Sequence, residues 1–140
     1  MAPVRPGEKP GFVQLLDNVT RTTSYTSETL LAKTESGILA VLSVTAASGT
    51  GGLTVRINAQ EQPIHAGTSA PWVAPLNLAP AAVTSTGDYT YSIYPFGAAS
   101  GGNVTQATTG FIPRDFSLTV AHADASSYTY SLGYYLLLWP

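Results

Sequence analysis

Three residues near the end of the chain, His122, Asp124 and Ser126, are of the types that form a hydrolase triad. They stand at alternate positions of one short stretch, "HADAS" (122–126). A triad needs a serine on a sharp elbow, an oxyanion hole and a chain of hydrogen bonds, which residues so close along a turn do not form. The stretch therefore predicts turn chemistry, in which Asp124 caps the turn.

No other group of residues predicts a reaction. The two histidines, His65 and His122, have no carboxylate or second histidine at ligand spacing, so we expect no zinc or iron site. The acidic residues are scattered, and no pair is placed as acid and base. The glycine-rich "GTGG" and "GAASGGN" lack the Lys-Ser/Thr that follows in a phosphate loop. The sequence predicts a protein that is not an enzyme and has no cofactor and no metal.

The composition points instead to contact with other proteins. Charged residues make up 10% of the chain, against about 25% in typical domains, and the net charge is -2. The sequence has no basic patch for phosphates, which argues against direct nucleic-acid binding. It also has no apolar run of the kind a signal peptide or a membrane span needs. A neutral surface of Ser, Thr, Ala, Gly and Tyr is easily desolvated, which favours packing against protein.

The elements that carry these residues follow a period of two. Alternating stretches include "GILAVLSVTAA" (37–47), which predicts a central strand, "LTVRINAQ" (53–60), "DYTYSIYP" (88–95), "FSLTVAHA" (116–123) and "YTYSLGYYLLL" (128–138). Glycine-rich "SGTGG" (48–52) and "DASS" (124–127) between them predict hairpins. We therefore expect an all-β fold, an antiparallel β-sandwich or jelly-roll-like barrel.

The N-terminal residues predict an extended arm outside that domain. Three prolines, Pro3, Pro6 and Pro10, stiffen residues 1–19, and four apolar residues there need burial. We assign residues 1–19 to the arm and residues 20–140 to the sandwich, with a disordered leader as the alternative for the arm.

Ten residues are predicted to lie in protein interfaces. They come from the arm, from an apolar loop within 60–87 that is rich in proline, and from the outward side of the last strand. For the loop, the alternative is an irregular edge strand over 73–78 with Trp72 capping the core. In the last strand, Leu136 and Leu138 are predicted to face inward. The ten are Phe12, Val13, Leu15, Leu16, Trp72, Val73, Leu76, Tyr135, Leu137 and Trp139.

Three segments resemble a known group of proteins. They are "GILAVLSVTAASGTGGLTVRI" (37–57), "STGDYTYSIYPFG" (85–97) and "FIPRDFSLTVAHADASSYTYSLGYYL" (111–136). Their turn and strand motifs, "TA-SGT", "TG-Y---IYP" and "PR-F-LTV-H-D--S-TYS-G", resemble small β-sandwich proteins encoded among the structural genes of tailed bacteriophages. The resemblance implies a head decoration or minor capsid protein in the virion, on the capsid surface. It also implies the major capsid protein and further copies of the chain, as a trimer, for partners.

Two other functions stay open at this point. One is a neck or tail connector or fibre-base subunit of the virion. The other is a carbohydrate-binding module, in which Trp72, Tyr91, Tyr94 and Tyr135 would stack on sugar faces. An aromatic sugar site needs polar neighbours for the hydroxyl groups, whereas Trp72 stands among prolines and alanines.

Overall fold

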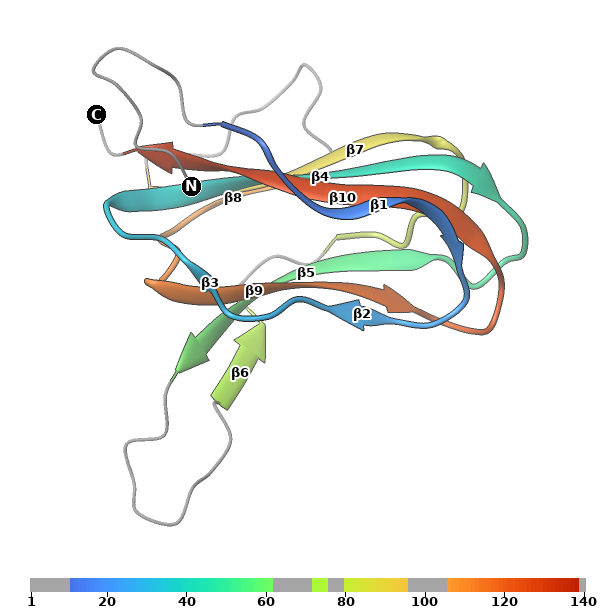
Figure 1. The fold of residues 1–140 in the computed structure, drawn as a ribbon, viewed down its shortest axis with the longest axis horizontal. Helices are drawn as coiled ribbons and strands as arrows, with labels where there is room; N and C mark the ends of the chain where they lie inside the picture. The colour runs from blue at the N-terminus through green and yellow to red at the C-terminus, as the bar shows by residue number, and fades with distance from the viewer. Residues whose placement is uncertain (1–10, 62–71, 76–79, 96–105, 139–140) are drawn as a thin grey trace.

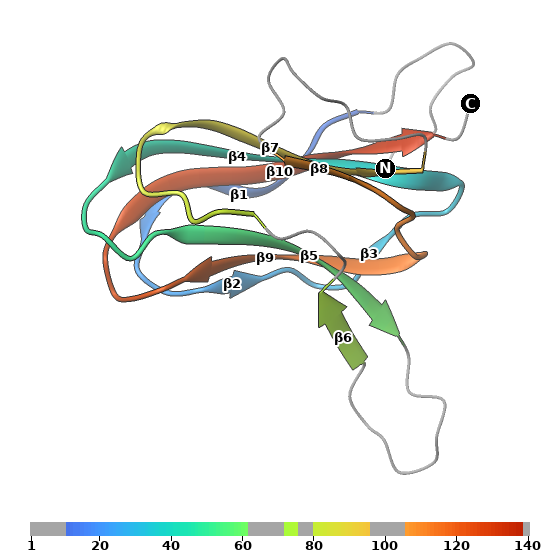
Figure 2. The same ribbon diagram turned by 180° about the vertical axis from the view of Figure 1, so that it is seen from behind.

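The computed structural model describes residues 11–61, 72–75, 80–95 and 106–138 of the chain, which form two stacked β-sheets (Figures 1 and 2). The first sheet has the order β1 (Val13–Arg21), β10 (Tyr128–Leu138), β4 (Glu35–Ala47), β7 (Gly87–Tyr94) and β8 (Gln106–Thr109). The second has the order β2 (Tyr25–Thr26), β9 (Asp115–His122), β5 (Leu53–Glu61) and β6 (Trp72–Pro75), and β3 (Leu30–Leu31) also pairs with β9. Neighbouring strands are antiparallel except β7 and β8. The described residues contain no helix, and the predicted all-β sandwich is confirmed.

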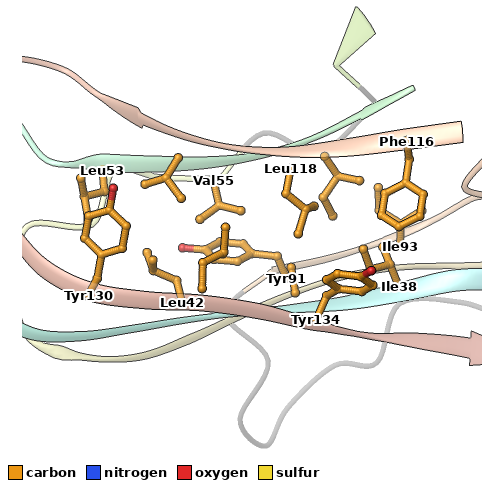
Figure 3. Packing of buried hydrophobic residues seen from close by; sticks show 14 of the residues in the cluster. Ile38, Leu42, Leu53, Val55, Tyr91, Ile93, Phe116, Leu118, Tyr130 and Tyr134 are labelled. Atoms are coloured by element: carbon orange, nitrogen blue, oxygen red, sulfur yellow. The ribbon is translucent and has the colours of Figure 1, made fainter. Parts of the chain in front are cut away.

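The core lies between the two sheets and follows the alternation of the sequence (Figure 3). Inward side chains of β4, β7 and β10 meet those of β5 and β9, and β4 is the central strand of its sheet, as predicted. An edge-on ring contact joins the layers, with the centroids of Phe116 and Tyr134 5.8 Å apart. The fully buried side chains include Ile38, Leu42, Leu53, Val55, Ile57, Tyr91, Ile93, Leu118, Tyr128, Tyr130 and Leu132.

The last strand keeps its predicted inward face as far as Leu136, which is buried. Leu138, also predicted to face inward, is 44% exposed, which corrects that expectation. The pairing of β10 with β4 shifts register between Leu137 and Leu138, so the alternation is broken at the end of the strand.

The two predicted hairpins are wrong. The residues 48–52 connect β4 in the first sheet to β5 in the second, and 124–127 connect β9 in the second to β10 in the first. Both are corners between sheets, and they bond to each other through Ser48 and Ser127, whose hydroxyl oxygens are 2.8 Å apart. Gly49 and Gly52 have φ of 115° and 87°, in the region that favours glycine. The tight corner therefore needs these glycines, although the two strands that it connects do not pair with each other.

The N-terminal segment differs from the expected arm. Residues 13–21 form β1, which pairs with β10 from Val13↔Tyr134 to Arg21↔Tyr128. The three prolines all precede Val13, so they do not interrupt the strand. Its apolar side chains Val13, Leu15 and Leu16 pack against the core of the chain's own sheet, whereas Val19 is 51% exposed. Beyond Arg21 the chain crosses to β2 in the second sheet. Residues 1–10 lie outside the described part of the chain.

The C-terminal end of β5 and its partner β6 extend beyond the two-layer body (Figures 1 and 2). Their pairing runs from Asn58↔Pro75 to Glu61↔Trp72. For Trp72 to Pro75 the structure therefore has the edge strand that was the alternative to an apolar loop.

Candidate interaction surface

The outer face of the first sheet, turned away from the core, carries a group of apolar side chains. Cross-strand pairing sets Tyr135 of β10 beside Leu39 of β4, and Gly133 beside Val41. The ring of Phe12 lies over Gly133, where any side chain would overlap it, and its centroid is 5.0 Å from that of Tyr135 at a tilt of 49°. The absence of a side chain at Gly133 thus leaves the space that the ring of Phe12 occupies.

A second glycine on the same face is covered by the next strand. Leu137 pairs with Gly37, and the ring of Tyr94 crosses Gly37 beside Leu137. The hydroxyl of Tyr94 donates to the carbonyl oxygen of Leu138 at 3.1 Å, which fixes the ring. We call the six residues of this region the apolar patch: Phe12, Leu39, Val41, Tyr94, Tyr135 and Leu137.

The patch is accessible in the isolated chain. Phe12 is 45% exposed and Tyr135 is 38% exposed, while Leu39, Val41 and Leu137 are half-buried. None of the six residues carries a charge at neutral pH.

The other half of this outer face is polar, and its side chains bond to one another. The hydroxyls of Thr20 and Thr129 are 2.6 Å apart, and that of Ser43 donates to Asp88 Oδ1 at 2.6 Å. Thr45 donates to Asn18 Oδ1 at 3.1 Å. These internal bonds mean that a partner need supply few hydrogen bonds to cover this half. We call the six residues the polar half: Asn18, Thr20, Ser43, Thr45, Asp88 and Thr129.

The outer side of the second sheet carries a polar cluster in which Asn58 and Ser117 are buried, and Leu31 of β3 is an exposed apolar residue of this sheet, at 46%. Asn58 Nδ2 donates to the hydroxyls of Ser117 and Thr119 at 3.1 and 3.0 Å, and Thr119 lies 3.0 Å from the hydroxyl of Thr26. Arg56 is exposed and has no hydrogen bond or ion pair with the described residues.

The predicted interface residues divide between the patch and the core. Phe12, Tyr135 and Leu137 are in the patch. Three others are half-buried and pack against the protein's own core, so their need for burial is largely met within the chain: Val13, Leu15 and Leu16. Trp72 and Val73 lie on β6, whose side chains are not described, and Leu76 and Trp139 lie outside the described residues.

Sequence reasoning missed Leu39, Val41 and Tyr94 as members of the surface. The signal was present for two of them, since the first half of "GILAVLSVTAA" is apolar on both sides of the strand. Tyr94 gave no such signal, because its place depends on the pairing of β7 beside β4 over Gly37.

The residues that suggested a triad are arranged as a turn. Asp124 Oδ1 accepts the backbone N–H of Ser126 at 2.9 Å, which confirms the predicted cap. Hydrogen bonds from the side chain and the backbone of Ser126 lower the pKa of the Asp124 carboxyl. No group of three or more metal-ligating side chains occurs in the described part of the chain.

His122 contacts a tyrosine of the last strand. Its Nε2 is 2.9 Å from the hydroxyl of Tyr130, and its Nδ1 has no hydrogen-bond partner among the described residues. The guanidinium of Arg21 lies 5.0 Å from the centroid of the same tyrosine and donates to its carbonyl oxygen at 2.7 Å. Burial lowers the pKa of His122, and the nearby Arg21 acts in the same direction. These contacts join His122, Tyr130 and Arg21 in one cluster.

No protein-family model matches the chain, and no curated protein and no solved structure is significantly similar to it. A search of the described residues for a helix long and apolar enough to cross a membrane finds none.

Proposed function

We propose that this chain is a structural virion protein of a tailed phage, of the capsid decoration type. It would bind the outside of the head and stabilise contacts between major capsid subunits. The observation that carries the proposal is the apolar patch, an uncharged and accessible surface on a sandwich that has few charges anywhere. The turn and strand motifs that resemble phage structural proteins support the same function.

The patch favours a role in assembly for energetic reasons. Burying a large apolar side chain is worth about 1.5–3 kcal/mol, and leaving it in water forfeits that free energy in every copy. A protein that binds the assembled shell and not its free subunits stabilises the shell by mass action. Many weak apolar contacts repeated over a particle therefore suit a decoration protein.

A connector or fibre-base subunit at the neck or tail of the virion would use the same kind of surface and remains the second candidate.

A carbohydrate-binding role is less favoured, because one of its four aromatic residues, Tyr91, is fully buried. The hydroxyl of Tyr94 donates to a backbone carbonyl, and the hydroxyls of the polar half already bond to a hydroxyl, a carboxylate or an amide of the same chain. Few free polar groups are left to bind sugar hydroxyls beside the exposed ring of Tyr135.

The test is binding of the purified protein to particles that lack it, followed by cosedimentation and electron microscopy. We expect saturable binding at regular positions on the head and a higher temperature for DNA release. Density only at the neck or tail would favour the second candidate. Absence of binding to any part of the particle would contradict the proposal.

A further inference from the structure

We propose that the outer face of the first sheet packs against the same face of a second copy of this chain, and that the apolar patch is the centre of that contact. The inference deepens the proposed function, since it names one partner of the surface on which that function rests. Copies joined in this way on an assembled shell would link neighbouring sites, which is how the patch would serve the proposed function.

Charge favours a second copy as the occupant. The patch is uncharged, so its best partner is another uncharged apolar surface, and the patch of a second copy has that property. A net charge of -2 gives little long-range repulsion between copies. In the polar half the hydroxyls are already bonded within the chain, and Asp88, the one charged residue among its six, already accepts the hydroxyl of Ser43.

The size of the face also matches. Four strands, β1, β10, β4 and β7, spaced about 4.8 Å apart, give a width of roughly 19 Å. The 11 residues of β10, which rise about 3.3 Å each, give a length of roughly 36 Å. The resulting area, about 700 Å², is close to the roughly 800 Å² that each partner buries in a stable protein interface. The patch alone is too small, so the contact would also include the polar half beside it.

The edges of the sheets are less suited to self-association than this face. The pairing of β1 shifts register twice, between Gln14 and Leu16 and between Leu16 and Val19, which distorts the edge. At the other edge β8 is only 4 residues long. A face-to-face contact between sheets, about 10 Å apart, is a standard way to bury side chains of this kind.

The first experiment measures self-association of the full chain by sedimentation equilibrium. We expect a dimer with a micromolar or lower dissociation constant, and not the trimer that the sequence resemblance implies, because a contact between identical faces closes with two copies. The variant Tyr135→Glu places a charge at the centre of the contact and should raise that constant by about tenfold or more. The matched control Thr54→Glu places the same charge on the outer face of the second sheet and should leave it unchanged. Circular dichroism of both variants shows whether the sandwich is intact.

A second experiment reports the geometry and does not depend on a loss of binding. The chain has no cysteine, so a spin label at Tyr135→Cys or at Thr54→Cys is unique. In a face-to-face pair the first sheets are about 10 Å apart and the second sheets about 30 Å apart, because each sandwich adds a layer spacing of about 10 Å. We therefore expect a short distance between labels at 135 and a long one between labels at 54.

A monomer at high concentration, or a dimer with the short distance at position 54, would overturn the inference. So would a trimer in which neither position gives a short distance. The proposed function fails separately: if the dimer forms as described but does not bind particles, only the virion role is lost. If a monomer binds particles and Tyr135→Glu prevents it, the patch faces the shell and only the self-contact is lost.

Discussion

Replacement of Tyr91 by phenylalanine tests whether the buried hydroxyl of this residue lacks a hydrogen-bond partner and so destabilises the fold. The Tyr91 side chain is fully buried between the sheets (Figure 3), and its hydroxyl has no hydrogen-bond partner among the described residues. A buried hydroxyl without a partner costs about 1–3 kcal/mol. Its removal leaves a void of roughly 10 Å³, which costs only about 0.2 kcal/mol at about 24 cal/mol per Å³. We therefore expect Tyr91→Phe to stabilise the fold by about 1–2 kcal/mol.

The matched control is Tyr128→Phe. The hydroxyl of Tyr128 is also buried, but it accepts the backbone N–H of Gly52 at 2.9 Å. Without it that N–H is left unpaired at a buried corner, so the control should destabilise the fold by about 1–3 kcal/mol. For a chain of this size each kcal/mol shifts the melting temperature by roughly 3–4 °C, so calorimetry separates the two variants clearly.

Alkaline titration gives an independent check of the same tyrosine. Burial raises the pKa of Tyr91 to about 12, so the folded state holds this proton more tightly than the unfolded chain does. The stability linked to Tyr91 is complete below about pH 10 and is lost as the pH rises toward the folded value. In Tyr91→Phe the decline between these values should be shallower. If Tyr91→Phe is instead as destabilised as Tyr128→Phe, the hydroxyl has a partner in solution and the reasoning fails.

Four further outcomes are expected. The lowered pKa of His122 means that the folded state binds its proton less readily, so stability measured by urea unfolding should fall as the pH drops below about 6.5. A His122→Gln variant should lack part of that fall. Gly52→Ala, at a φ of 87°, should cost about 1–3 kcal/mol by thermal unfolding, whereas Gly110→Ala, which meets only ordinary contacts, should cost less than about 1 kcal/mol. Gly133→Ala should displace Phe12, change the near-ultraviolet circular dichroism and weaken dimerisation while the fold remains. The dimer should be insensitive to sodium chloride, because its centre has no charge; a strong decrease of affinity with salt would contradict an apolar contact.

The faces of the strands could be predicted from the sequence because alternation depends on only one strand at a time. Tyr91 and Ile93 of β7, and Tyr130, Leu132 and Leu136 of β10, are buried where the period of two places them. The turn at Asp124 was equally local, and the structure has its predicted hydrogen bond.

The pairing of the strands could not be predicted in the same way. A short glycine-rich connection such as 48–52 suits a hairpin or a corner between sheets, and the choice depends on strands far away in the sequence. The position of β1 could not be predicted for the same reason, because its partner β10 lies more than a hundred residues later in the sequence. Residues 13–19 were therefore predicted to be part of an arm outside the sheets. Leu39 and Val41 joined the patch for a related reason, since their neighbours on the face are Tyr135 and Gly133.

The two outer faces of the sandwich differ in which of their polar groups have hydrogen-bond partners. On the second sheet, Asn58, Ser117 and Thr119 bond to one another, and Arg56 points into solvent without a partner among the described residues. On the first sheet, Thr20 bonds to Thr129, Ser43 to the Asp88 carboxylate and Thr45 to Asn18, and the apolar patch lies beside these pairs. Desolvating the apolar patch thus costs little and buries apolar area, whereas covering Arg56 on the second face would strand a guanidinium away from water. The two faces have similar strands, but only the first is suited to association, and the reason lies in which polar groups already have partners.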